Sequence, residues 1–209
     1  MHENTGLSPV EGLMRGHGVI DRVLLIYTEI IGKIRSRGCR NLAVLHHAAS
    51  EAAGLAKVFI EDYHQELENE YIFPLFRDVD GYEPVVNTLL FQHCAAKKIT
   101  ADILRLLERG SRRNVIWPRL LCLMQGYVRM YRPHSAREDT FVFPEVHKLI
   151  TPDKWNELGD MFEEILQERF AKENINGFQV ITDKLTETEK ALGIYNLGQF
   201  TPKYFTQGN

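Results

Sequence analysis

The sequence predicts an all-α protein: an antiparallel up-down-up-down four-helix bundle with a C-terminal helical extension. Two observations lead to this prediction. Apolar residues recur at three- and four-residue intervals along most of the chain, whereas the alternating pattern of a half-buried strand is nearly absent. Proline and glycine then divide this pattern into segments that are long enough for the helices of a bundle.

Four long helices are expected within residues 1–150, which we predict to form one bundle domain. The first begins at Pro9, because proline is tolerated in a first helical turn. Glycine follows the first and third helices, as it commonly follows a helix end. The predicted helices cover residues 9–37, 42–73, 84–109 and 115–147. Pro133 lies inside the fourth, where its missing backbone donor should bend the helix.

Residues 151–209 are expected to form a C-terminal helical extension and tail that pack on the bundle. Thr151-Pro152-Asp153 is typical of a helix start, and an apolar stripe between Trp155 and Leu166 would cover the outside of the bundle. A shorter helix is expected near residues 178–192. An aromatic tail follows, and the sequence leaves open whether it docks on this domain or on a partner.

Composition excludes several classes of protein. The 209 residues suffice for one well-buried domain with an appended segment, and a net charge of -3 gives no attraction for nucleic acid or an anionic membrane. No apolar stretch approaches the ~18 residues of a membrane span, and no export signal is visible. The three cysteines form no disulfide framework, so a cytoplasmic location is expected. A homo-oligomer stays open.

One motif occurs twice. In each copy a histidine and a glutamate stand four residues apart, and a Phe-Pro pair follows with its proline ten residues after the histidine. The copies are His64 and Glu68 before Phe73-Pro74, and His134 and Glu138 before Phe143-Pro144. Helical positions four apart share one face, so each imidazole and its carboxylate can reach the same cavity. Two such pairs suggest two metal ions.

Prolines that mark helix ends place two further histidines beside these pairs. Pro9 precedes His17 by eight residues and Pro84 precedes His93 by nine, while the histidines of the repeat precede their prolines by ten. At ~1.5 Å per residue these offsets are roughly 12, 13.5, 15 and 15 Å. In an up-down-up-down bundle, four imidazoles and two carboxylates would therefore meet in one layer, where bundles commonly build metal sites.

The predicted ligand set favours certain metals. Imidazole nitrogen with carboxylate oxygen suits iron, zinc or manganese, and the thiolates of structural zinc sites are missing from the set. Two divalent ions carry four positive charges, of which two glutamates offset two, so a bridging hydroxide or oxide is expected. Six protein ligands leave coordination positions open on an octahedral pair, which implies that a small molecule binds.

The ordered set of segments resembles the hemerythrin-like proteins with an HHE cation-binding domain, particularly bacterial members with a helical C-terminal extension. It consists of the segment from His17, Phe59 to Pro74, the segment from His93, and His134 to Pro144. The resemblance covers about residues 12–150 and implies a four-helix bundle with a non-haem di-iron centre that binds dioxygen or related small ligands. The ligands it implies are His17, His64, Glu68, His93, His134 and Glu138.

Two positions depart from the oxygen-carrying hemerythrins. Those proteins have a second histidine one turn after the third-segment histidine, where this chain has Lys97, so reversible oxygen transport is put in doubt. They take their last carboxylate five residues after the histidine, which would select Asp139. The internal repeat and the alignment of one helix face favour Glu138 instead.

Other side chains near the expected site have two interpretations each. Asp21 is one turn after His17 and would be an extra ligand, an acceptor for an imidazole N–H, or a surface ion pair. Tyr71 and Tyr127 would hydrogen bond a metal-bound ligand or serve as core residues with one satisfied hydroxyl. A ferritin-like di-iron bundle needs two ExxH motifs, and only Glu61 and His64 provide one.

Three functions remain open. The site would bind dioxygen, nitric oxide or peroxide in oxygen or redox sensing, and this is the favoured hypothesis. The alternative is an enzyme that reduces peroxide, oxygen or nitric oxide, which the open position beside Lys97 would help. The third is iron storage, or a structural metal site that ties four helices together.

Overall fold

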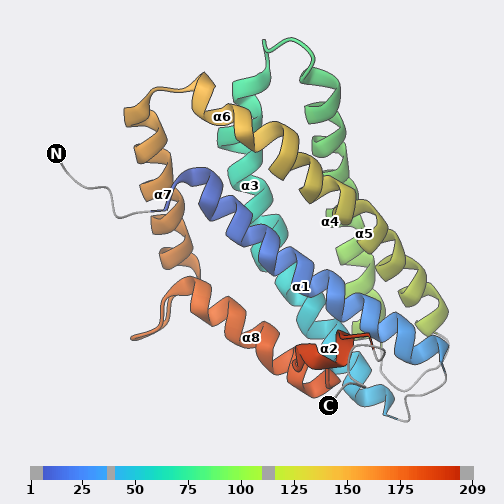
Figure 1. Ribbon diagram of the computed structural model, residues 1–209. Helices are drawn as coiled ribbons and strands as arrows, with labels where there is room; N and C mark the ends of the chain where they lie inside the picture. The colour runs from blue at the N-terminus through green and yellow to red at the C-terminus, as the bar shows by residue number, and fades with distance from the viewer. Residues whose placement is uncertain (1–6, 37–40, 110–115, 203–209) are drawn as a thin grey trace.

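The structure is a computed structural model and describes residues 7–36, 41–109 and 116–202. Within these ranges the regular structure is helical and contains no strand, apart from one bridge between Lys172 and Ile175 (Figure 1). The predicted all-α class is therefore confirmed for the described residues. Among them, no helix is both long and apolar enough to cross a membrane.

The first helix, α1, spans Pro9–Arg35. Ser8 caps it by accepting from the backbone N–H of Glu11, whose carboxylate accepts from the backbone N–H of Ser8. This reciprocal capping box satisfies two donors that a helix start leaves free. The apolar face of α1 then faces the core, where Ile20, Val23 and Tyr27 are buried.

The second helical segment runs from Leu42 to Phe76 and changes geometry along its length. It begins as α2 (Leu42–Leu55) and continues as a π-helical segment, Ala56–His64. One α turn, α3 (Gln65–Leu67), is followed by a second π segment, Glu68–Ile72, and a 3-10 turn, Phe73–Phe76. A helix was predicted here over 42–73, but its wider turns were not.

The third and fourth helices complete the bundle. Helix α4 spans Glu83–Glu108 with a proline in its first turn, and α5 spans Trp117–Arg137 with Pro133 inside it. After α5 the chain forms a π segment, Glu138–Val142, and then α6 (Phe143–Leu149). The predicted ends near Gly38 and Gly110 lie outside the described residues.

The four long helices enclose one core. Helix α1 packs against α5 and α2, and α4 packs against the same two helices (Figure 1). Alanines dominate the buried face of α2, which lets neighbouring backbones approach closely, while larger residues fill the space between the other helices. These include Phe59, Phe76, Tyr127, Tyr131 and Phe143.

Two further helices pack on this bundle. Helix α7 spans Pro152–Phe170 and is capped by Thr151, and α8 spans Gly177–Leu192. Both contact α1, and α8 also contacts α2. A 3-10 turn, Leu197–Phe200, follows.

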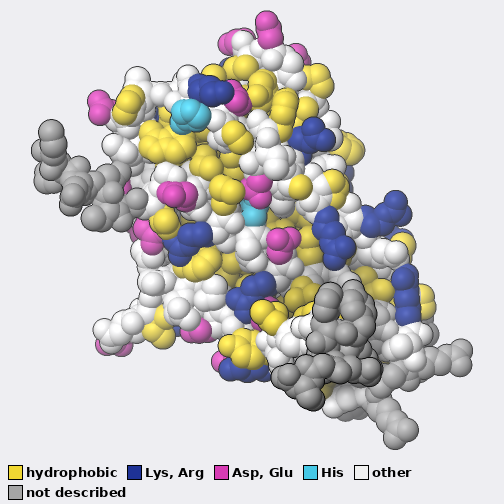
Figure 2. All heavy atoms as spheres, viewed as in Figure 1, with side chains coloured by type: hydrophobic (Ala, Val, Ile, Leu, Met, Phe, Trp, Pro, Cys, Tyr) yellow, Lys and Arg dark blue, Asp and Glu magenta, His cyan; other side chains and the backbone are white. Residues whose placement is uncertain are grey.

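Acidic and basic side chains both lie among hydrophobic ones on the face drawn in Figure 2. Tyr204 and Phe205 of the predicted aromatic tail lie outside the described residues.

Candidate metal centre

The structure brings all six predicted ligand residues together inside the bundle. They come from α1, from the second helical segment, from α4, and from the end of α5 with the π segment that follows it, and none is more than 4% exposed. They form two groups, within each of which the possible ligand atoms lie within 4.8 Å of one another. The first group is His17, His64 and Glu68, and the second is His93, His134 and Glu138.

Each HxxxE pair closes across one helical turn. In the first pair His64 Nε2 lies 3.2 Å from Glu68 Oε1, and in the second His134 Nε2 lies 3.0 Å from Glu138 Oε1. The residues between each histidine and its glutamate are α-helical, so positions i and i+4 project from the same face. The repeat in the sequence therefore corresponds to a repeated geometry.

The two carboxylates connect the groups. Glu68 places Oε1 beside His64 and Oε2 at 3.4 Å from His93 Nε2 of the other group. Glu138 does the reverse, with Oε1 beside His134 and Oε2 at 3.3 Å from His17 Nε2. Each glutamate thus offers one oxygen to each group, which is the arrangement that a pair of bridged cations requires.

The buried polar atoms of the two groups fit a bound metal. Both oxygens of Glu68 and of Glu138, together with Nε2 of His17 and of His64, have no hydrogen-bond partner in the protein. In the second group Nε2 of His93 and of His134 face each other at 3.1 Å. Buried acceptors without donors cost free energy, whereas cations among them would satisfy all of them together.

Three of the four histidines have an acceptor on the other side of the ring. The Nδ1 atoms of His17, His93 and His134 lie 2.7, 2.8 and 2.8 Å from side-chain oxygens of Asp139, Asn69 and Gln92, respectively. Since these oxygens accept, each Nδ1 carries the proton and donates it. The Nε2 lone pair is then left for a metal, and the ring is held in orientation.

These outer partners were missed by the sequence reasoning, although a signal exists. Asn69 directly follows Glu68, Asp139 directly follows Glu138, and Gln92 directly precedes His93. In both copies of the repeat the residue after the glutamate serves a histidine on another helix. Asp139, considered above as a ligand in place of Glu138, is therefore the hydrogen-bond acceptor of His17.

The fourth histidine is positioned by close packing. A Cβ atom built on Gly16 of α1 would lie 2.4 Å from Nδ1 of His64. Only glycine leaves room for the imidazole at this distance, so α1 and the second helical segment can approach closely.

The phenylalanines of the repeat cover two other histidines. Phe143 stacks on His17 at 5.4 Å between ring centroids, and Phe73 stacks on His93 at 5.5 Å. The Phe-Pro pairs of the repeat thus form part of the apolar wall.

The carboxylates give the site a negative potential that favours bound cations. Burial would raise the pKa of Glu68, but the neighbouring His64 and His17 lower it well below its usual value, so Glu68 is ionised. Burial lowers the pKa of His93 to about 4, which leaves its ring neutral at pH 7. For His17, burial is outweighed by Asp139, Glu138 and Glu68, which raise its pKa to about 12. That corner of the site therefore attracts positive charge.

Other predicted neighbours lie elsewhere. Asp21 is exposed and belongs to neither group, and the acceptor role considered for it falls to Asp139. Tyr71 packs against the ring of Phe162 of α7, at 5.7 Å between centroids, as a packing residue would. Tyr131, which the sequence reasoning did not single out, contacts the His134 ring at 5.1 Å between centroids. Tyr127 lies behind it, fully buried.

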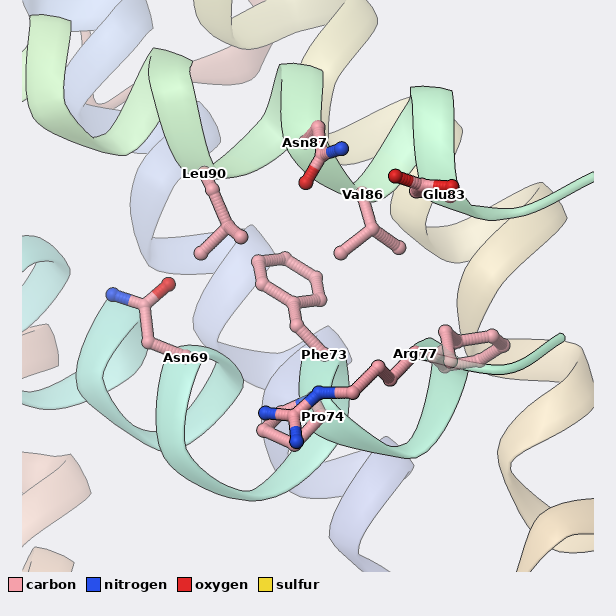
Figure 3. Close-up of a pocket in the computed structure, with 9 residues that line it drawn as sticks. Asn69, Phe73, Pro74, Arg77, Glu83, Val86, Asn87 and Leu90 are labelled. Atoms are coloured by element: carbon pink, nitrogen blue, oxygen red, sulfur yellow. The ribbon is translucent and has the colours of Figure 1, made fainter.

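Two surface pockets lie on either side of the first half of α4. One has a volume of about 290 Å³ and is walled by Asn69, Phe73, Val86 and Leu90, with Arg77 near Pro74 (Figure 3). The other has a volume of about 410 Å³, and its lining includes Gln92 and His134. The first pocket is lined by Asn69, which accepts from His93, and the second is lined by His134 itself and by its acceptor Gln92.

Comparison with known proteins agrees with this geometry. Uncharacterized proteins from Mycobacterium bovis and from two strains of Mycobacterium tuberculosis are each 35% identical over 193 residues, which cover 92% of this chain and 73% of each relative. No solved structure matches. The model of the hemerythrin HHE cation-binding domain matches residues 8–146, a stretch that contains α1 to α5 and all six clustered residues. The chain belongs to the hemerythrin HHE cation-binding domain family.

Proposed function

We propose that this protein is a non-haem di-iron protein that binds dioxygen or a related small ligand, nitric oxide or peroxide, in oxygen or redox sensing or response. The observation that carries the proposal is the pair of glutamates, each of which offers one oxygen to each histidine group. A carboxylate shared in this way holds two cations at a fixed separation. Membership of a cation-binding family supports the same proposal.

Within this proposal, His17 and His64 would hold one ion, His93 and His134 the other, and Glu68 and Glu138 both. Imidazole nitrogen and carboxylate oxygen suit iron, and they also suit zinc and manganese. Two divalent ions and two glutamates leave two positive charges, which a bridging oxide would balance and a bridging hydroxide would reduce to one. When bound, iron would supply open coordination positions and redox chemistry for dioxygen, nitric oxide or peroxide.

The protein's own residues would prepare the site for a small ligand. Asp139, Asn69 and Gln92 orient three imidazoles, so little reorganisation is needed when the ligand binds. Phe73 and Phe143 keep bulk water from the rings that they cover. Four histidines and two glutamates leave coordination positions for the ligand, since an octahedral pair needs more donors than these six residues offer.

A di-iron enzyme that reduces peroxide, oxygen or nitric oxide is the second candidate. It is favoured by the pocket of about 410 Å³ that reaches His134, because a turnover site must exchange substrate and product with solvent. Repeated consumption of peroxide by the iron-loaded protein would support the enzyme. One stoichiometric adduct without turnover would support the binding protein.

The proposal is tested by loading the metal-free protein with ferrous iron in the absence of oxygen, counting the bound iron, and recording the optical spectrum after exposure to air. Two iron ions per chain and the bands of an oxo-bridged ferric pair are expected. Fewer than two bound iron ions, or no ferric bands after exposure to air, would contradict the di-iron assignment.

Two variants at neighbouring positions distinguish a proposed metal ligand from a residue that only accepts a hydrogen bond from a ligand. Glu138→Gln should lose bound iron, because it removes a negative oxygen shared by both ions. Asp139→Asn should keep two irons, since an amide oxygen can still accept from His17 Nδ1, as Asn69 does for His93. Loss of iron in Asp139→Asn with full retention in Glu138→Gln would instead assign Asp139 as the ligand.

A further inference from the structure

The larger of the two surface pockets, which we call the Arg137 pocket, lies between α4 and α5 beside the second histidine group. Its apolar wall includes Val85, Leu89 and Pro133, and its volume is about 410 Å³. One water molecule takes up roughly 30 Å³ of the liquid, so the pocket is much larger than a diatomic ligand needs. Its volume is that of a site for a small organic molecule.

The Arg137 pocket carries one positive charge. Among the described residues that line it, Arg137 is the one with a permanent charge, and none is an aspartate or a glutamate. The Arg137 side chain is exposed, and its guanidinium carbon lies 5.9 Å from the centroid of the Phe141 ring. No carboxylate within the described part of the chain forms an ion pair with Arg137, so its charge is available to an anion from outside.

Gln92 connects the Arg137 pocket to the candidate metal centre. Its Oε1 accepts from His134 Nδ1 at 2.8 Å, while its amide N–H groups have no hydrogen-bond partner in the described residues. Both Gln92 and His134 line the pocket. An acceptor bound there would satisfy the free donors of Gln92. Because linked hydrogen bonds polarise one another, it would also strengthen the bond from His134 to Gln92.

The pocket on the other side of α4, which we call the Arg77 pocket, has a similar set of residues with one difference. Its amide is that of Asn69, which accepts from His93 Nδ1 at 2.8 Å, and its arginine is Arg77 (Figure 3). Glu83 also lines this pocket and balances the charge of Arg77. Of these two pockets, the Arg137 pocket is therefore the one that favours an anion.

We propose that the Arg137 pocket binds a small monocarboxylate with an apolar body, and that the bound carboxylate alters the metal centre through Gln92. Guanidinium and amide N–H groups are the donors that suit a carboxylate, and one cation balances one negative charge. The apolar wall suits a hydrocarbon body. Binding needs no metal, whereas the effect on the metal rests on the proposed function. Gln92 acts through His134 and is a positioning residue.

Benzoate is the probe for this site, and benzyl alcohol is its neutral control. Titration of the metal-free protein, followed by nuclear magnetic resonance, should shift the side-chain signals of Gln92 and Arg137 until they saturate. Benzyl alcohol has nearly the same body without the charge. It should bind about tenfold more weakly or less, because it cannot make hydrogen bonds to Arg137 that are assisted by two charges.

Two arginine variants test where benzoate binds. Arg137→Gln should weaken benzoate binding about tenfold, whereas Arg77→Gln should leave it unchanged because Arg77 lines the other pocket. Both arginines are exposed, and helical circular dichroism equal to that of the wild type establishes that each variant is folded. Gln92→Glu keeps an acceptor for His134 Nδ1 but replaces the donating amide with a negative charge, so benzoate binding should be lost.

Iron-loaded protein tests the effect on the metal centre. Benzoate should shift the optical bands of the wild-type and Arg77→Gln proteins, and Arg137→Gln should need about a tenfold higher concentration for the same shift. A shift at equal concentration in Arg137→Gln would mean that benzoate coordinates iron directly, which would overturn the link through Gln92.

The remaining outcomes separate the carboxylate site from the function of the metal. Equal binding of benzoate and benzyl alcohol, or unweakened binding to Arg137→Gln, would overturn the carboxylate site. Saturable binding of benzoate without any change in the optical bands would overturn the link to the metal alone. Failure of the wild-type protein to bind iron would overturn the proposed function, and the titration of metal-free protein would still decide the carboxylate site.

Discussion

Gly16 makes the contact between α1 and His64. Adding one methyl group at this position, as in Gly16→Ala, should disturb the candidate metal centre. Gly16→Ala would put a Cβ at 2.4 Å from His64 Nδ1, so the imidazole must move away from the other ligands. Overpacking of this kind costs about 1–3 kcal/mol. We expect lower unfolding free energy in urea and weaker iron retention against a chelator.

Gly18→Ala is the control for this prediction, because a Cβ at Gly18 meets no atom within 4 Å and the residue lies in the same helix. Alanine in an open helical position should stabilise by about 0.5–1 kcal/mol. Equal stability and equal iron retention in the two variants would contradict the packing argument for Gly16.

Glu61 predicts how stability depends on pH. Burial raises its pKa above the ordinary value, so the folded protein binds this proton more tightly than the unfolded chain does. The ionised carboxylate therefore destabilises the fold above the folded pKa, and this penalty disappears below the unfolded pKa. Glu61→Gln should be more stable than the wild type at pH 7, and the difference should vanish near pH 4.

Urea unfolding of the metal-free proteins at both pH values measures this difference. The ion pair with Lys57 that the variant also removes contributes little, because the lysine side chain is 45% exposed. A Glu61→Gln variant that is less stable than the wild type at pH 7 would show that the carboxylate is satisfied in the core.

Single residues also show how far the sequence could lead. The HxxxE spacing identified four of the clustered residues, because i and i+4 share a face wherever the backbone is α-helical. His17 and His93 followed from distances to prolines. The sequence did not identify Asn69 and Gln92 as hydrogen-bond acceptors, because their partners, His93 and His134, lie on neighbouring helices. A spacing within one helix carries no information about such contacts.

At the scale of helices, the Phe-Pro pairs explain two of the three π segments in the described residues, Glu68–Ile72 and Glu138–Val142, which periodicity did not predict. Pro74 and Pro144 have no N–H to donate, and their rings would clash with the carbonyl four residues earlier in a regular α-helix. The preceding phenylalanines instead donate to carbonyls five residues earlier, those of Glu68 and Glu138. Both wide turns thus begin at a proposed ligand, as π turns often do at functional sites.

One ion pair joins α8 to α1. Arg22 donates to both carboxylate oxygens of Glu189 at 2.7 and 2.9 Å and also to the hydroxyl of Thr186. Glu189 is only 8% exposed at its side chain, so solvent screens the pair weakly. A double-mutant cycle of Arg22→Ala and Glu189→Ala should give a coupling energy of about 1–2 kcal/mol.

Lys154 and Glu157 of α7 form the comparison pair, because both side chains are well exposed. Their cycle should give about 0.3 kcal/mol. Urea unfolding measures both couplings. Coupling energies that do not differ would show that α8 is held by apolar packing, with the Arg22 contact adding nothing beyond a surface pair.

At the scale of the whole molecule, prediction succeeded where one physical rule decides the outcome. The all-α class followed from periodicity, and α7 followed from a Thr-Pro start and an apolar stripe. The contacts among Tyr27, Tyr127 and Tyr131 could not be predicted in the same way. These residues come from two helices, and their contacts depend on how α1 and α5 pack.

The same assembly predicts how metal and fold depend on each other. The six clustered residues come from four helical segments, and their acceptors face one another without donors, so the metal-free bundle carries a penalty that bound cations relieve. A ligand at 100 times its Kd stabilises the folded state by about 2.7 kcal/mol. For a chain of this size, removing the metal with a chelator should then lower the Tm by about 5–10 °C.

Hydrogen exchange locates the effect that calorimetry measures. Amides in the turns around His17, His64, His93 and His134 should exchange faster after metal removal, because those turns lose the ion that joins them. Amides of α8 should change little, since its ion pair with Arg22 does not involve the site. An unchanged Tm with unchanged exchange would mean that the bundle is fully preformed. The metal would then serve ligand binding alone, and its use as a clip between helices would be excluded.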